Sequence, residues 1–192
     1  EQLFTHYADR FDLRVNRKYV RKLSGGQAAI LSASIALASG APLTLLDEIQ
    51  APLDVPTRYA LYEEVLTLAA EVMEGKRPQR RFLIASHMVS ELEKVGEAVI
   101  VLKKGELLAH ETIDDFTCRV SALTGHASDV ERFLAAHPNL AVIASRELGS
   151  TREIVVDLRG SAVGDTELAS HSLTSSPCSF QDAFAYLIQE ND

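Results

Sequence analysis

Apolar residues recur along the start of the chain at spacings that predict two helices. Leu3, Tyr7 and Phe11 follow one another every four residues, which is the spacing of one helical face. Residues 27–39 are small or apolar on nearly every side, and Gly40 follows them. This second pattern predicts a buried helix that ends at the glycine, because a surface helix would keep one polar face.

Two short apolar runs, 43–46 and 82–85, have the length of strands and are each followed by polar residues. Continuous apolar runs of this length favour parallel strands buried on both faces. Between them, residues 57–72 repeat apolar positions on one helical face. The polar and basic segment 16–22 predicts a connector.

Residues 98–102 and 106–110 flank a Lys-Lys-Gly turn and predict a β-hairpin, and residues 112–123 predict a helix. The alternation of strands and helices up to this point predicts an α/β domain over residues 1–123.

The pattern changes in the remaining residues, 124–192. Helices are predicted at 129–136 and 179–189 and strands at 140–144 and 154–158, whereas residues 160–176 show no clear period. The sequence therefore predicts a small α+β extension at the C-terminal end.

Composition excludes several classes of protein. The chain of 192 residues has 27 acidic and 19 basic side chains and a formal net charge of -8, so we expect no nucleic-acid partner. No apolar run approaches the roughly 20 residues that a membrane-spanning helix needs. Cys118 and Cys178 lack metal-ligand spacing and are expected to be free, buried thiols.

Ser24, Gly25 and Gly26 lie where a loop enters the predicted helix at 27–39. Backbone amides without a β-carbon nearby, at the positive end of a helix dipole, form a site for an anion such as phosphate. A serine cap on the helix is the structural alternative.

Three further residues fit phosphoryl transfer. Asp47 ends an apolar strand, where a carboxylate suits Mg²⁺, and Glu48 follows it as a candidate base that polarises an attacking water. His87 follows the second strand and is suited to donate a hydrogen bond to a terminal phosphate. Each residue alone also fits a structural role, as a cap or a core histidine.

Taken together, these stretches resemble the second half of an ATP-binding-cassette (ABC) ATPase, and the resemblance covers residues 1–123. Leu23-Ser24-Gly25-Gly26-Gln27 matches the signature loop, Leu43–Glu48 the Walker B strand, Asp54 the D-loop and His87 the switch histidine. The resemblance implies the C-terminal portion of a P-loop ABC ATPase domain that binds ATP and Mg²⁺. Ser24, Gly25, Gly26, Gln27, Asp47 and Asp54 would bind the cofactor, with Asp47 at the metal, and Glu48 and His87 would be catalytic.

The resemblance also implies partners and a place in the cell. A second ATP-binding subunit, identical or different, would complete the ATP site, with the signature loop acting in trans. A transmembrane permease would bind the dimer, which would lie peripherally on the cytoplasmic face of the cell membrane. The stretch 179–184 is similar to the end of ATPases that drive two-component exporters, so export is expected.

Departures from the family pattern keep other interpretations open. No Gly-x-x-x-x-Gly-Lys-[Ser/Thr] motif, the Walker A phosphate loop, occurs in the sequence, which predicts a fragment or a truncated product whose own ATP binding is uncertain. Ile49, Ala51-Pro52 and Ala28-Ala29 replace common family residues and indicate a divergent member. The alternatives are an ABC ATPase that acts on nucleic acid or the ribosome, and a non-catalytic truncated module that pairs with a partner.

Overall fold

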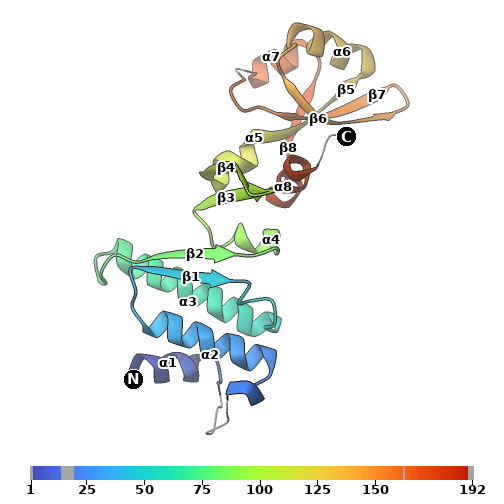
Figure 1. The fold of residues 1–192 in the computed structure, drawn as a ribbon. Coiled ribbons are helices and arrows are strands. Elements are labelled where there is room, and N and C mark those ends of the chain that lie inside the picture. Colours follow the sequence, from blue (N-terminus) through green and yellow to red (C-terminus); the bar gives the residue numbers. More distant parts are fainter. Residues whose placement is uncertain (1, 14–19, 162, 190–192) are drawn as a thin grey trace. The chain divides into compact units, whose positions relative to one another are not determined.

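The computed structural model describes residues 2–13, 20–161 and 163–189. It consists of two compact units, Glu1–Met88 and Val89–Asp192 (Figure 1). The sequence pattern instead predicts a domain boundary at residue 123. The difference arises because the predicted hairpin and the helix after it pack with the C-terminal residues. Most of the predicted connector at 16–22 lies outside the described residues.

The first unit contains three α-helices, a short 3-10 helix and two strands among the described residues. They are α1 (Gln2–Arg10), η1 (Val20–Lys22), α2 (Gly25–Ala38), β1 (Leu43–Asp47), α3 (Val55–Met73) and β2 (Arg81–Ala85). The α2 helix is the central element of the core, since its small apolar residues let α1 and β1 pack closely on it. The helix predicted at 27–39 is therefore present, with its first turn two residues earlier, but it is not buried on every side, since Ile35 is 55% exposed.

The strands β1 and β2 pair in parallel, and Asp47 lies in register with Ala85. Only one face of this pair is buried: Leu46 is 2% exposed, whereas Leu45 is 62% exposed. The prediction that both faces are buried is wrong. Continuous apolar sequence marks a strand of a parallel sheet, but it does not say which faces have a neighbour.

Arg80 joins the end of α2 to β1. Its guanidinium donates to the carbonyl oxygens of Leu37 and Ala36, both at 2.9 Å, and to Thr44 Oγ1 at 3.0 Å. Burial lowers the pKa of Arg80, and the group remains a cation facing the carbonyl end of the helix. Arg80 is therefore structural, since its guanidinium holds the last turn of α2 to β1.

The second unit begins with a short helix and a hairpin and continues into a four-stranded antiparallel sheet. Its elements are α4 (Val89–Leu92), β3 (Ala98–Lys103), β4 (Glu106–Thr112), α5 (Ile113–Arg119), β5 (Val120–His126), α6 (Ala127–Ala136), β6 (Ala141–Leu148), β7 (Thr151–Asp157), α7 (Asp165–Ser170), β8 (Thr174–Pro177) and α8 (Phe180–Ile188). The predicted hairpin is present as β3 and β4, which pair antiparallel. Among the described residues, no helix is both long and apolar enough to cross a membrane.

The strand order β6-β7-β5-β8 and the element order β-α-β-β-α-β give the second unit a ferredoxin-like sheet. Helices α6 and α7 cover one face through Phe133 and Leu168, and α5 and α8 cover the other through Phe116 and Phe180. The extension is therefore α+β, as the sequence predicts, but it is larger than predicted.

One prediction in this unit is wrong. The helix predicted over 112–123 ends at Arg119, and residues 120–126 form the central strand β5. A strand covered on both faces has no alternating pattern, so periodicity does not separate it from a buried helix. The stretch 160–176, for which the sequence shows no clear period, contains α7, with Leu168 buried, and most of β8, whose residues are all exposed.

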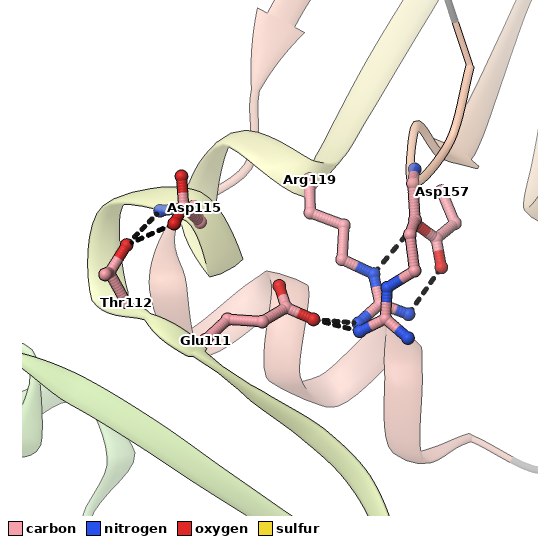
Figure 2. Close-up of polar contacts among 6 residues, drawn as sticks. Glu111, Thr112, Asp115, Arg119 and Asp157 are labelled. Carbon is pink, nitrogen blue, oxygen red and sulfur yellow. Dashed lines mark hydrogen bonds and ion pairs between the residues drawn. The ribbon is translucent and has the colours of Figure 1, made fainter.

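A buried charge cluster connects the hairpin to the sheet (Figure 2). Arg119 donates to both carboxylate oxygens of Asp157, at 2.8 and 2.5 Å, and to Glu111 at 3.0 Å; Arg159 pairs with the same glutamate. Burial alone would raise the pKa of Asp157, but the hydrogen bonds from Arg119 and the Arg159 amide and the two positive charges lower it overall. The cluster explains why β4 and α5 belong to the second unit.

Candidate functional site

The carboxyl ends of β1 and β2 lie at one edge of the parallel pair, where ligands of α/β proteins commonly bind. Glu48 follows β1, and its amide extends the strand pairing by donating to the Ala85 carbonyl at 3.0 Å. Its φ of +49° lies in the left-handed region, which a residue with a β-carbon seldom adopts. Strain of this kind is concentrated at functional sites, so it marks Glu48 as a candidate.

The structure brings the two predicted catalytic residues into contact. Glu48 Oε2 lies 2.8 Å from His87 Nδ1, with 43% of the glutamate side chain and 73% of the histidine side chain exposed. An ionised carboxylate only accepts hydrogen bonds, so Nδ1 carries the hydrogen in this contact. A neutral His87 in this tautomer has Nε2 as an acceptor, and Nε2 donates to a phosphate only once it too is protonated.

Gln50 is a third member of this group that the sequence analysis does not select. Its side chain is fully buried, and Nε2 donates to Glu48 Oε2 at 3.3 Å and to Ser86 Oγ at 2.5 Å. Ser86 Oγ also accepts the Met88 amide at 2.9 Å. Gln50 lies between Ile49 and Ala51, two departures from the family pattern. These departures are the feature of the sequence that could have pointed to Gln50.

Asp47 ends β1 with an exposed side chain, for which the structure gives no hydrogen bond or ion pair with another described residue. A free carboxylate at a strand end fits Mg²⁺, which takes one or two carboxylates and completes its shell with water and phosphate oxygens. Across the described part of the chain, no group of three or more His, Cys, Asp or Glu side chains could hold a metal by itself. Asp47 therefore suits a metal that arrives with a phosphate ligand.

The segment Ser24–Gln27 forms the first turn of α2 and its cap. The Gln27 amide donates to Ser24 Oγ and the Ser24 amide donates to Gln27 Oε1, both at 3.2 Å, which is a capping box. The first helical bond runs from Ala28 to the Ser24 carbonyl, so the amides of Gly25 and Gly26 precede it. The predicted serine cap is present, with Gln27 Oε1 engaged in it, and the Gly25 and Gly26 amides lie outside the first helical bond.

The loop from Glu48 to Asp54 joins β1 to α3, and its Pro52 lies against the start of α2 at Gly25 and Gly26. An open groove of about 420 Å³ borders Ser24 and Gly26 on one side and Pro52 and Asp54 on the other. Asp54 Oδ1 accepts the Thr57 amide at 2.9 Å and caps α3, and the hydrogen bonds from Thr57 lower the pKa of Asp54. Asp54 therefore has a structural role in addition to any role at an interface.

Comparison with known proteins finds ATP-binding proteins of transport systems among the relatives of this chain. No protein-family profile matches the chain. It is 29% identical over 127 residues to the choline transport ATP-binding protein OpuBA of Bacillus subtilis, covering 60% of this chain and 32% of that protein. It is 28% identical over 116 residues to the metal-staphylopine import system ATP-binding protein CntD of Staphylococcus aureus, covering 58% of this chain and 41% of that protein. The chain thus spans less than half the length of these relatives.

A solved structure described as an ATP-binding subunit of an ABC transporter shares the fold. The superposition has a TM-score of 0.51 at 22% identity and covers 60% of this chain and 45% of that one. The α/β fold predicted from the resemblance is thereby confirmed. The predicted export direction has no support in these comparisons, since the name of CntD describes import.

Proposed function

Because the chain is related in sequence and fold to the ATP-binding subunits of ABC transporters, we propose that it contributes to an ATPase that powers transport through a membrane permease. The chain would supply the signature loop, the Walker B carboxylates and the switch histidine of that ATPase. The direction of transport and the transported substrate are not part of the proposal.

The observation that supports the proposal most directly is the contact of 2.8 Å between Glu48 and His87. Under the proposal, Glu48 accepts a hydrogen bond from the attacking water and increases its nucleophilicity. His87 orients the glutamate in the resting state. It would hydrogen-bond the terminal phosphate once its ring leaves Glu48 for that phosphate. Both residues lie at the edge where β1 and β2 end, so one bound phosphate is within reach of both loops.

Asp47 would hold Mg²⁺ directly or through water, and the bound ion would neutralise charge that develops on the phosphates. Asp47 is suited to this because its carboxylate is exposed beside Glu48 and has no competing ion pair among the described residues. The neighbouring Glu48 remains available for the water.

The signature loop would act on ATP bound by a second subunit. The Gly25 and Gly26 amides and the Ser24 hydroxyl would donate to the γ-phosphate, aided by the α2 dipole. No Gly-x-x-x-x-Gly-Lys-[Ser/Thr] motif occurs in the 192 residues, so the phosphate-binding lysine of this composite site is not among them. The subunit would dock on the permease from the cytoplasmic face of the membrane.

The proposal is tested by Glu48→Gln in the intact protein. The change keeps the shape but removes the carboxylate, so phosphate release from Mg-ATP should fall by about 100-fold while ATP binding persists. ATP should then accumulate in a closed dimer, which size-exclusion chromatography detects. Glu106→Gln, an exposed glutamate in β4, is the matched control. Unchanged turnover in Glu48→Gln would show that Glu48 does not activate the water.

A further inference from the structure

Gln50 is a buried polar residue whose bonds only partly satisfy it. Its side chain is 0% exposed, and Nε2 is shared between Glu48 Oε2 and Ser86 Oγ. Its Oε1 is also buried and has no hydrogen-bond partner among the described residues. A buried acceptor without a partner is unfavourable, and an apolar residue of similar size would avoid that cost. A buried amide at position 50 therefore indicates a role other than filling space.

The two bonds of Nε2 connect the loops that carry the candidate catalytic residues. Glu48 lies in the loop after β1, and Ser86 lies in the turn after β2, directly before His87. Ser86 is itself anchored, because its Oγ accepts the Met88 amide. Gln50 thus ties a flexible carboxylate to a fixed point next to the histidine.

The geometry at Glu48 indicates what this connection achieves. Oε2 accepts from both Gln50 Nε2 and His87 Nδ1, at 3.3 and 2.8 Å. Two donors on one oxygen fix the carboxylate plane and leave Oε1 as the oxygen that can accept from a water. Without Gln50, a side chain that is 43% exposed would be held by His87 alone among the contacts of the described residues.

We propose that Gln50 is a positioning residue that holds the Glu48 carboxylate against His87 by linking the loop after β1 to the turn after β2. This inference rests on the proposed function, because positioning Glu48 matters for turnover only if Glu48 activates water. The arrangement itself exists independently of nucleotide, which allows it to be tested without ATP hydrolysis.

The first test is spectroscopic and uses the 192-residue chain. In histidine-labelled protein at alkaline pH, the ¹⁵N shifts of the His87 ring report which nitrogen carries the hydrogen. The wild type should show the Nδ1–H tautomer that the contact with Glu48 requires. Gln50→Leu, which is apolar and of similar size, should move the population towards Nε2–H. Ser86→Ala, which removes the other anchor of Gln50, should cause a smaller change in the same direction.

The control is Ser34→Ala in α2, since Ser34 is also 0% exposed and its Oγ also lacks a partner among the described residues. It should leave the His87 shifts unchanged. A Gln50→Leu chain that unfolds at lower temperature but keeps the wild-type His87 tautomer would overturn the proposal, because a purely structural role predicts that result. If Gln50→Leu does not fold, Ser86→Ala takes its place. A wild-type His87 tautomer in Ser86→Ala would then overturn the proposal.

The second test uses turnover in the intact protein. Gln50→Leu should lower kcat by on the order of tenfold and leave KM for ATP nearly unchanged, since misplacing a catalytic group affects the transition state. An intact protein without ATPase activity would refute the proposed function and leave the tautomer result standing. An active Gln50→Leu protein with wild-type kcat would refute the positioning role alone.

Discussion

Gly26 lies so close to Pro52 that a β-carbon on the glycine would be 3.1 Å from the Pro52 carbonyl oxygen. At Gly25 the nearest atom would be the Pro52 β-carbon, at an ordinary 3.6 Å. The start of α2 and the loop after β1 therefore meet at Gly26, where a side chain would push against backbone.

This difference predicts unequal effects of two alanine substitutions on stability. Gly25→Ala should be neutral or raise stability by up to about 1 kcal/mol, because alanine favours helix and meets no close atom. Gly26→Ala should be less stable than Gly25→Ala by about 1 kcal/mol or more, because the Pro52 loop must shift. Thermal unfolding of the two variants measures the difference. Equal melting temperatures would mean that the loop gives way without cost.

Ser24→Arg should block ATP-dependent dimerisation under the proposed function. The arginine would place bulk and charge in the groove beside the signature glycines, and turnover should fall by about 100-fold. Ser179→Arg is the matched control, because Ser179 also caps a helix by accepting a backbone amide, that of Asp182. Each change should cost about 1 kcal/mol of stability through the lost cap. Light scattering with Mg-ATP should show a dimer for Ser179→Arg and none for Ser24→Arg. Dimers from both variants would exclude a role of Ser24 in closing over ATP.

The cluster at Arg119 predicts a pH-dependent contribution to stability. Asp157→Asn should lower the free energy of unfolding by about 2 kcal/mol near neutral pH, because Arg119 loses a bidentate partner inside the fold. The folded-state pKa of Asp157 is lowered, so its contribution is complete above its unfolded value of about 4 and is lost as the pH falls through the folded value.

Urea titrations between neutral and acid pH measure this dependence. The gap between wild type and Asp157→Asn should close below about pH 4. Glu153→Gln provides the control, since its partner Arg146 is 67% exposed and such pairs contribute less than about 1 kcal/mol. A gap that stays constant down to acid pH would show that the cluster does not stabilise the fold through Asp157 ionisation.

The two cysteines should differ in reactivity. Both are free, but Cys118 is exposed and Cys178 is half-buried, so the prediction that both are buried is wrong for Cys118. Burial raises the pKa of the Cys178 thiol, and the charges of Asp182 and Glu153 raise it further. Iodoacetamide at neutral pH should modify Cys118 about tenfold faster or more, because the thiolate is the reactive form. Single-cysteine variants, Cys118→Ser and Cys178→Ser, separate the two rates by mass spectrometry.

Local pattern was sufficient for much of this chain. The all-round apolar character of residues 27–39 predicts the central helix of the first unit, and the Lys-Lys-Gly turn predicts the hairpin. Both follow from rules that act over a few residues, namely helical or strand period and turn chemistry. The order of Ser24, Asp47, Glu48 and His87 along the chain likewise carries the resemblance to ABC ATPases, and that resemblance can be found from the sequence alone.

Only the tertiary structure shows which faces are covered and which distant residues meet. Leu45 is exposed although its run reads as a buried strand, and β5 reads as part of a helix although it is the centre of a sheet. Glu48 and His87 are 39 positions apart, and Gln50 and Ser86 are 36 apart. Their contacts depend on the parallel pairing of β1 and β2. Periodicity reports one segment at a time, whereas burial and hydrogen bonding depend on neighbours that arrive from elsewhere in the chain.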